Sequence, residues 1–248
     1  MTKDIGRREV LTTIAAVGSA ALVSGKARVA LAEAKTAPAV DPATAMGKHA
    51  PAALPFDPKK LRGLSERLIV SHHDNNYVAA VKGLNRVEEE LSRATKDNPP
   101  FLIAGLKERE LTFTNSLILH EHYFGNLGGD GKASGAVEQA IGAAFGGFGH
   151  WEEQFRATGT SLAGGSGWTI LDLNLHTGQL RTYWAGGHSQ SVAFGAPLLV
   201  MDMYEHAYQM DYGAAAPKYI DAFFANIRWD EVSHRYERGM AALKALHG

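Results

Sequence analysis

One stretch of the chain restricts its fold more than any other, because an apolar segment leads directly into metal-binding types of side chain. Pro197–Met201 is short and wholly apolar, which predicts a buried strand, and the chain from Tyr204 onward has the pattern of a helix. Asp202 follows the predicted strand and His206 comes four residues later, so both side chains can reach one point. Mixed oxygen and nitrogen ligands of this kind suit a hard, redox-active metal.

The amino-acid composition excludes several kinds of site and several classes of protein. The chain has 248 residues, of which 45% are hydrophobic and 21% charged, so it can bury a sizeable core. It has no cysteine, which excludes disulfides and thiolate ligands, so a metal must be bound by His, Asp or Glu. The sequence contains no run of eighteen apolar residues that would predict a membrane span, and no basic patch with interleaved aromatic residues that would predict binding to nucleic acid.

The N-terminus has the parts of an export signal in the usual order. Arg7 and Arg8 form a twin-arginine pair, residues 12–24 are small and apolar, and Ala30–Ala32 offers a cleavage site. We therefore interpret residues 1–32 as a twin-arginine signal peptide, which predicts passage through the Tat machinery and a periplasmic or otherwise exported protein. The alternative is an amphipathic N-terminal helix.

The rest of the chain is predicted to be an α+β protein, with an N-terminal helical hairpin and a C-terminal α/β domain that contains a small three-stranded antiparallel sheet. Residues 33–57 are rich in Ala and Pro and predict a tether that is ordered only where it lies on the domain surface. The hairpin domain is predicted over residues 58–128 and the α/β domain over residues 129–248.

The apolar spacing predicts two helices in the hairpin. Leu64 and Leu68 begin one apolar stripe, and after an adjustment Tyr77 and Val81 begin a second, so the first helix has an interruption. The second helix is predicted from about Leu106 to Phe124. In the second half, the predicted helices cover about 136–145, 151–157, 217–227 and 230–246, and the predicted strands cover 168–175, 179–184 and 197–201.

Several blocks of residues occur in the order found in one known family. They are Ser65–Asn85, Leu119–Leu127, Phe145–Phe148, Gly165–Trp168, Asp202–Tyr208 and Asn226–Trp229. Together they resemble the iron/manganese superoxide dismutases over roughly residues 58–240. The resemblance implies an enzyme that converts superoxide to oxygen and hydrogen peroxide. The alternative function is that of a metal-binding protein with the dismutase fold and little or no turnover.

The resemblance also implies a metal site. One iron or manganese ion per subunit would be bound by His72, His120, Asp202 and His206, with solvent as a fifth ligand. A gapless alignment of the first block places His72 at the ligand position, whereas a shifted alignment would place Ile69 there. The choice between iron and manganese stays open.

The same resemblance suggests residues around the metal. Trp168 would line the pocket, and the glutamine that holds the bound solvent in iron-type members is replaced by Ser116. His188 lies near the corresponding manganese-type position, where it either donates to the solvent or is an exposed loop histidine. Gln190 is a second candidate for this contact.

The largest departures from the family pattern lie at the predicted pocket entrance. The gateway tyrosine is replaced by Ala80, and the arginine before a proline by Ala216. Tyr77, one helical turn before Ala80, could direct its hydroxyl into part of the vacated space. We therefore include Tyr77 with Trp168 and His188 as candidate catalytic residues.

A subunit interface is implied as well. Glu205 would bridge to the partner subunit's His206, as in dimers of this family, so a homodimer is expected, although a tetramer is not excluded. The gateway histidine is replaced by Asn76 and its cross-subunit tyrosine by Gln209. Because both ends of one contact change together, an amide–amide contact between Asn76 and Gln209 is the simplest interpretation.

Overall fold

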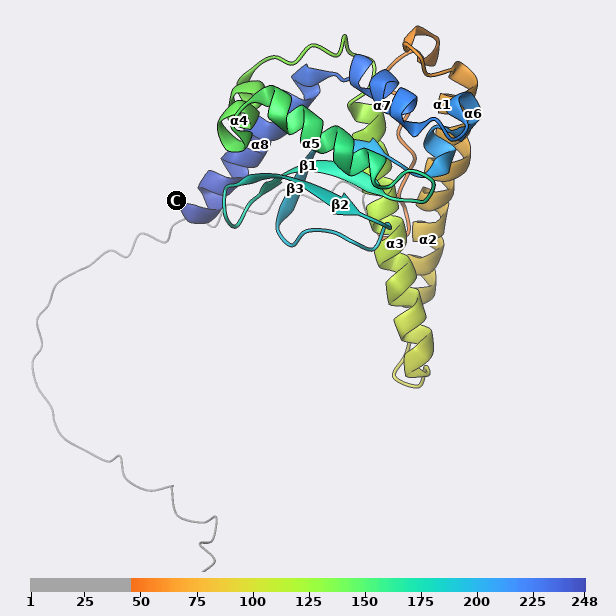
Figure 1. Ribbon diagram of the computed structural model, residues 1–248. Coiled ribbons are helices and arrows are strands. Elements are labelled where there is room, and N and C mark those ends of the chain that lie inside the picture. The colour runs from red at the N-terminus through yellow and green to blue at the C-terminus, as the bar shows by residue number, and fades with distance from the viewer. Residues whose placement is uncertain (1–45) are drawn as a thin grey trace, which may run out of the picture. The chain divides into compact units, whose positions relative to one another are not determined.

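The computed structural model describes residues 46–248, so the predicted signal, residues 1–32, and the first part of the tether lie outside the described residues. Two long helices form a hairpin, and the chain then continues into helices arranged around a three-stranded sheet (Figure 1). This confirms the predicted fold class. None of the helices in this part of the chain is long and apolar enough to cross a membrane. The elements are η2 (Pro58–Lys60), α1 (Glu66–Ser71), the π-helix η3 (His72–Tyr77), α2 (Val78–Ser92), α3 (Pro100–Gly125), α4 (Ala136–Phe145), α5 (Phe148–Thr160), β1 (Trp168–Asn174), β2 (Leu180–Ala185), β3 (Gly195–Asp202), η4 (Glu205–Ala207), α6 (Gln209–Tyr212), α7 (Ala216–Ala225) and α8 (Trp229–His247).

The interruption predicted in the first helix is a π-helical segment. Helix α1 begins at the N-cap Ser65, whose Oγ accepts a hydrogen bond from the backbone N–H of Leu68. The wider turn of η3 then rotates the chain before α2 begins. This rotation explains why the apolar stripe before residue 72 and the stripe that starts at Tyr77 do not share one phase, although Leu68 and Tyr77 are both buried.

Helix α3 is longer than the sequence spacing predicts. It begins at Pro100, six residues before the predicted start, because a proline in the first turn has the φ angle of a helix and loses no hydrogen bond there. The added turns carry few buried side chains, and Phe101 is exposed. The helix ends at Gly125, where a side chain would collide with the guanidinium of Arg235.

The sheet has the order β2-β1-β3, and all neighbouring strands are antiparallel. A bulge interrupts the pairing of β1 with β3 and places Pro197 opposite Asp172. Pro197 is tolerated because β3 is an edge strand. Leu198 has no partner in this register, and Nη1 of Arg235 on α8 donates to its carbonyl at 3.1 Å.

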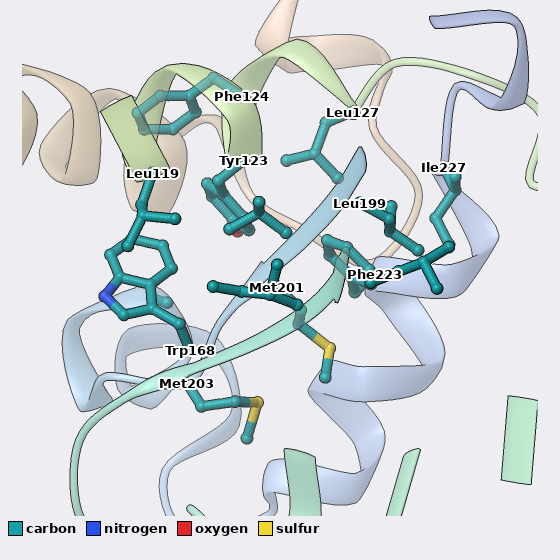
Figure 2. Packing of buried hydrophobic residues seen from close by; sticks show 14 of the residues in the cluster. Leu119, Tyr123, Phe124, Leu127, Trp168, Leu199, Met201, Met203, Phe223 and Ile227 are labelled. Carbon is teal, nitrogen blue, oxygen red and sulfur yellow. The ribbon is translucent and has the colours of Figure 1, made fainter. Parts of the chain in front are cut away.

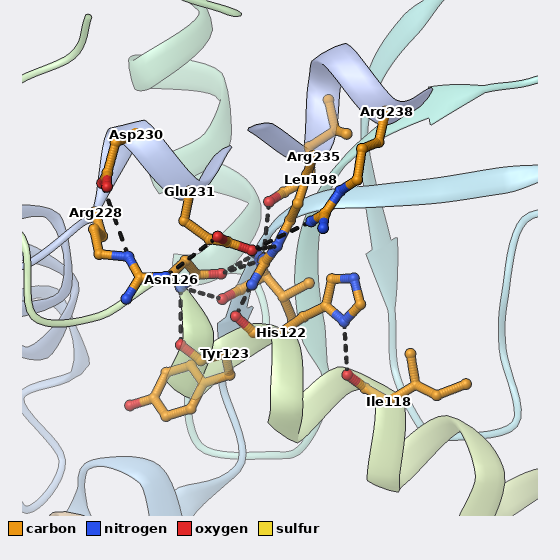
Figure 3. Close-up of polar contacts among 11 residues, drawn as sticks. Ile118, His122, Tyr123, Asn126, Leu198, Arg228, Asp230, Glu231, Arg235 and Arg238 are labelled. Carbon is orange, nitrogen blue, oxygen red and sulfur yellow. Dashed lines mark hydrogen bonds and ion pairs between the residues drawn. The ribbon is translucent and has the colours of Figure 1, made fainter. Parts of the chain in front are cut away.

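Arg235 joins three parts of the fold in this way. Its Nη1 also donates to the carbonyl of His122 near the end of α3, and its Nε donates to the carboxylate of Glu231 one turn earlier (Figure 3). A guanidinium this deeply buried is stable only when its donors are satisfied. The network therefore connects the end of α3 to β3 and α8.

The core lies where α3 meets the sheet. Leu119 and Tyr123 of α3 face Leu199 and Met201 of β3, and Phe223 of α7 completes the contact (Figure 2). Helices α4, α5 and α8 cover the sheet in Figure 1. Burial of these apolar side chains contributes most of the driving force for this packing, and it holds the end of β3 beside the middle of α3.

One predicted element is wrong in detail. The chain from Tyr204 is not a continuous helix but the 3₁₀ turn η4 followed by the four-residue helix α6. Oδ1 of Asp202 accepts a hydrogen bond from the backbone N–H of Tyr204 at 2.8 Å, and Tyr204 keeps an extended backbone. Such a side-chain turn competes with helix formation, so the helical pattern is broken just after the strand.

The described end of the tether lies against the first hairpin helix. The backbone N–H of His49 donates to Oδ1 of Asn85, and Nδ2 of Asn85 donates back to the carbonyl of His49. The backbone N–H of Ala52 donates to the hydroxyl of Tyr77 at 2.8 Å. From residue 46 onward the tether is therefore packed on the surface of the domain.

Candidate metal centre

Four side chains from four different elements meet beside the core. His72 is the first residue of the π-helix η3, His120 lies on α3, Asp202 ends β3, and His206 lies in η4. One ligand atom from each lies within 4.8 Å of the others. The structure thus brings together all four residues that the sequence analysis selected.

The distances have a common centre. Oδ2 of Asp202 lies 3.1 Å from Nε2 of His72, 3.6 Å from Nε2 of His120 and 3.3 Å from Nε2 of His206. Ligand atoms that bind one ion at about 2.1 Å, with angles of about 90–120°, are about 3.0–3.6 Å apart. The spacing of these four atoms therefore fits a single bound ion.

The buried nitrogen atoms support the same conclusion. Both ring nitrogens of His72, and Nε2 of His120, have no hydrogen-bond partner among the described residues, although all three atoms are buried. His72 is close to Asp202, but the two groups lack the angles of a hydrogen bond. Buried polar atoms without a partner are costly, and a cation bound at this point would give two of these nitrogens a partner.

Electrostatics keep three of the four donors in the form that binds a metal, while the pKa of His206 is raised because attraction to Asp202 outweighs burial. Burial lowers the pKa of His72, and burial together with the charge of His72 lowers the pKa of His120 to about 3. Burial alone would raise the pKa of Asp202, but attraction to His206, the hydrogen bond from His206 and attraction to His72 outweigh it and hold that pKa well below its usual value. Neutral imidazoles and an ionised carboxylate are the ligand forms that a metal needs.

Hydrogen bonds to groups outside this cluster hold the ring of His120 and the backbone of Asp202. Nδ1 of His120 donates to the carbonyl of Ser116 at 2.6 Å, which leaves Nε2 as the free lone pair. The hydroxyl of Tyr219 donates to the carbonyl of Asp202 at 2.6 Å. The orientation of the His120 ring and the backbone position of Asp202 are therefore set before any ion binds.

Comparison with known proteins gives the family. Residues 133–235 match the model for the C-terminal domain of iron/manganese superoxide dismutases. A protein from Cupriavidus metallidurans named superoxide dismutase [Fe] is 48% identical over 183 residues, which cover 73% of this chain and 92% of that relative. The chain belongs to the iron/manganese superoxide dismutase family.

More distant relatives carry the names of both metals. A superoxide dismutase [Fe] from Aquifex aeolicus is 35% identical over 76% of this chain and 92% of its own length. A superoxide dismutase [Mn] from Halobacterium salinarum is 32% identical over 75% of this chain and 93% of its own length. The protein is thus a superoxide dismutase of the Fe/Mn type, with iron or manganese at a site of three histidines and one aspartate.

The dismutase has a pocket of about 210 Å³ in front of this cluster. Three positions where the family pattern has larger side chains line it, namely Asn76, Ala80 and Ser116. The residues that line the pocket include no Lys, Arg, Asp or Glu. The lining residues are Asn75, Asn76, Ala79, Ala80, Thr112, Phe113, Ser116, His120, His188 and His206.

Two of the candidate catalytic residues lie next to the ligands of the dismutase. Trp168 is fully buried, and its ring meets that of His120 edge to face at 5.1 Å. Its Nε1–H donates to Nδ1 of His188 at 3.0 Å. His188 is therefore not an isolated loop histidine, because it is bonded to Trp168 and lines the pocket.

The third candidate, Tyr77, lies outside the pocket, although its ring centre is 6.3 Å from that of His120. Its hydroxyl donates to Oε1 of Glu121 at 2.7 Å and accepts from the N–H of Ala52, and it is not among the residues that line the pocket. The phenol does not fill the space beside Ala80, because η3 turns it toward the tether instead.

The residues expected at a subunit interface lie on the surface of the single chain. Glu205 and Gln209 are exposed, and Asn76 is partly exposed and lines the pocket. Within the described chain the structure brings none of these three together by a hydrogen bond or an ion pair.

Two residues near the site escaped the sequence analysis. Tyr204 stacks on His188, with ring centres 4.6 Å apart and planes 11° from parallel, and Nδ2 of Asn115 donates to the carbonyl of His188 at 2.7 Å. Tyr204 lies between Asp202 and His206, at a position where the motif allows any residue. Its place between two ligands is a sequence signal that could have identified it. Asn115 carried no such signal, since its partner is 73 residues away.

Proposed function

We propose that this dismutase disproportionates superoxide at an ion held by His72, His120, Asp202 and His206, and that it does so after export. The observation that carries the proposal is the convergence of three imidazole nitrogens on one oxygen of Asp202, where buried nitrogens lack other partners. Three neutral imidazoles and one carboxylate leave net positive charge on a divalent or trivalent ion. That charge attracts a small anion.

The overall reaction combines two superoxide anions and two protons to give one oxygen and one hydrogen peroxide. A redox-active ion held by His72, His120, Asp202 and His206 would supply the one-electron exchange between the two anions. The chain has to admit the anion, hold the ligands in place and deliver protons. The pocket lined by Ala80 and Ser116 leads to the ligands His120 and His206, and it is large enough to hold water that carries protons.

His188 and Trp168 have defined roles in this proposal. Because Trp168 donates to Nδ1 of His188, the proton of the neutral imidazole is on Nε2, and that N–H is available to solvent or substrate in the pocket. Gln190, the other candidate for this contact, does not line the pocket, and its Oε1 accepts from the N–H of Gly186. We therefore assign the donor role to His188.

Tyr77 acts indirectly in this proposal. It lies in the same π-helix as His72, and its hydroxyl connects that segment to Glu121 of α3 and to Ala52 of the tether. This bracing keeps the first ligand in position. We also propose that the boundary between the two domains lies at residue 128. Each domain would then contribute two of the four ligands.

The protein is expected to work as a homodimer. Glu205 is exposed beside His206, and Gln209 follows on the same surface, so a second subunit could contact all three. Light scattering of the purified protein should give twice the chain mass. Glu205→Ala should lower the dimer fraction, whereas the matched exposed change Glu153→Ala should not. A monomeric wild-type protein would contradict this part.

Export is proposed on the sequence pattern of residues 1–32. Mass spectrometry of exported protein should give an N-terminus at or near Glu33, and replacing Arg7 and Arg8 by Lys should retain the protein inside the cell. Unchanged export of the Lys variant would exclude the twin-arginine route.

One experiment decides between an active dismutase and a metal-binding protein with little turnover. One feature of the pocket favours a metal-binding protein with little turnover. At Ala80 and Ser116 the pocket lacks the larger side chains of the family pattern. Metal analysis of the mature protein should find one iron or manganese per chain, and iron is the first to test because the 48% identical relative is named as an iron enzyme. A xanthine-oxidase-coupled assay on the same sample should show dismutation. Full metal content without dismutation would support the alternative.

A further inference from the structure

The pocket contains one histidine that does not belong to the four ligands, and the chain restrains it from three sides. His188 lies in the loop between β2 and β3, which runs from Gly186 to Phe194. Residues 189–194 of this loop are exposed. A side chain on such a loop has no fixed position unless other elements hold it.

The first restraint is on the backbone of the loop. Nδ2 of Asn115 donates to the carbonyl of His188 at 2.7 Å. Asn115 lies on α3, five residues before His120. The hydrogen bond therefore fixes His188 relative to the same rigid helix that carries a ligand.

The second and third restraints act on the ring. Trp168 donates to Nδ1 and thereby selects the tautomer. The ring of Tyr204 stacks on the His188 imidazole, with ring centres 4.6 Å apart, and on the His206 ring, with ring centres 5.3 Å apart. Stacking of this kind restricts the tilt of a ring, so Tyr204 aligns the planes of His188 and of a ligand.

We propose that Asn115 and Tyr204 are positioning residues of the dismutase, which act through His188 by holding its remaining N–H in the pocket. The inference rests on the donor role of His188 proposed above. Asn115 sets the place of the ring and Tyr204 sets its plane, while the contact with superoxide belongs to His188. A displaced donor loses most of its effect, because hydrogen bonds weaken steeply with distance and angle.

A double-mutant cycle separates this role from general stabilisation. The variants are Asn115→Leu, His188→Leu and the combination, each loaded with the resident metal and checked for equal metal content. The readouts are the equilibrium affinity for azide, measured by absorbance, and the midpoint reduction potential of the bound metal. Residues that act through one shared partner are not additive in such a cycle.

His188→Leu should weaken azide binding by about tenfold, the effect of losing a hydrogen bond to an anion, and should shift the midpoint potential. Asn115→Leu should weaken azide binding by about threefold and shift the potential in the same direction. In the His188→Leu background, Asn115→Leu should change neither quantity. If Asn115→Leu does not fold, Asn115→Ala takes its place in the cycle.

Two further variants complete the test. Gln190→Leu removes another amide hydrogen bond from the same loop, at Gly186, and should leave azide affinity and potential unchanged. Tyr204→Phe keeps an aromatic ring on His188 and should stay close to wild type, whereas Tyr204→Leu should resemble Asn115→Leu.

Four results would overturn the inference. Asn115→Leu could leave both quantities unchanged in the wild-type background, or it could have the same effect with and without His188. Equal effects of Gln190→Leu and Asn115→Leu would mean that any loosening of the loop suffices. If His188→Leu itself has no effect, the donor role of His188 fails together with the inference, while dismutation at the four-ligand site would still stand on the metal and activity measurements.

Discussion

Two buried carboxylates in the same small sheet have opposite surroundings. Asp202 ends β3, Asp172 lies in the middle of β1, and neither side chain is exposed to solvent, with a relative exposure of 0% for both residues. Asp202 is surrounded by imidazole nitrogens, whereas both carboxylate oxygens of Asp172 lack a hydrogen-bond partner among the described residues. The two carboxylates are therefore equally buried, and they differ in the groups that surround them.

The neighbours decide the charge. Attraction to His206 and His72 outweighs burial and holds the pKa of Asp202 well below its usual value, while burial alone raises the pKa of Asp172 to about 6. Asp202 is thus an ionised ligand, and Asp172 is a group whose charge destabilises the fold. The difference shows that a buried acid in this sheet is useful only where an ion or imidazoles can balance it.

The largest effect is expected when each of the two aspartates is replaced by asparagine in a separate variant. Asp202→Asn removes the carboxylate at the centre of the ligand cluster, so metal affinity should fall by at least about 100-fold, and dismutation should fall with it. Asp172→Asn is the matched control, because it makes the same change in the same sheet away from the ligands. Metal analysis after dialysis and the dismutation assay measure both. Equal metal loss in the two variants would contradict the conclusion that Asp202, unlike Asp172, is a metal ligand.

The second prediction concerns stability and pH. The folded-state pKa of Asp172, about 6, lies above its unfolded value of 3.8. Its unfavourable effect is therefore absent below pH 4, grows as pH rises, and is complete above pH 6. Asp172→Asn removes the charge, so at pH 7 it should stabilise the protein by up to about 3 kcal/mol, and near pH 4 it should make little difference.

Chemical denaturation of both proteins at pH 4, 5, 6 and 7, in the same metal state, measures this gain. A stability difference between wild type and Asp172→Asn that does not depend on pH would mean that Asp172 is neutralised by a group outside the described contacts. The contrast with Asp202 would then disappear.

The third prediction concerns the open side of the Asp202 cluster. Ala80 leaves space in the pocket that a phenol would fill, so wild type should admit azide readily and dismutate superoxide at a reduced rate. Ala80→Tyr should weaken azide binding by about fivefold, or about 1 kcal/mol, and should raise turnover. Azide titration and pulse radiolysis check the two parts. Tighter azide binding in Ala80→Tyr would contradict this account of the pocket.

The smallest expected effect is on salt dependence. The pocket walls include no Lys or Arg, so little attraction beyond the metal itself remains for salt to screen. The rate of dismutation should fall by less than about twofold between 10 and 150 mM salt. A steep decrease would show that cationic side chains outside the pocket, or from a second subunit, steer the anion.

Residues close together in sequence allowed much of this to be predicted. The alternating strand patterns and the helical spacing gave the α+β fold class, because these signals come from residues within one or two turns of each other. The resemblance of short local motifs to the dismutase family gave the four ligands. The start of α3 was misplaced because Phe101 and its neighbours add turns that bury little. The turn after β3 was misassigned because one side-chain hydrogen bond to Tyr204 overrides the helical pattern.

The tertiary structure decided everything that depends on contacts between distant segments. His188 had two possible interpretations in the sequence, and only the fold brings Trp168, Tyr204 and Asn115 around it. Tyr77 was expected near the pocket, but the π-helix directs it to the tether. The sequence by itself determined which residues can bind a metal, since ligand chemistry belongs to the side chain. Which buried groups are charged, and which donor faces the pocket, depended on neighbours that only the folded chain provides.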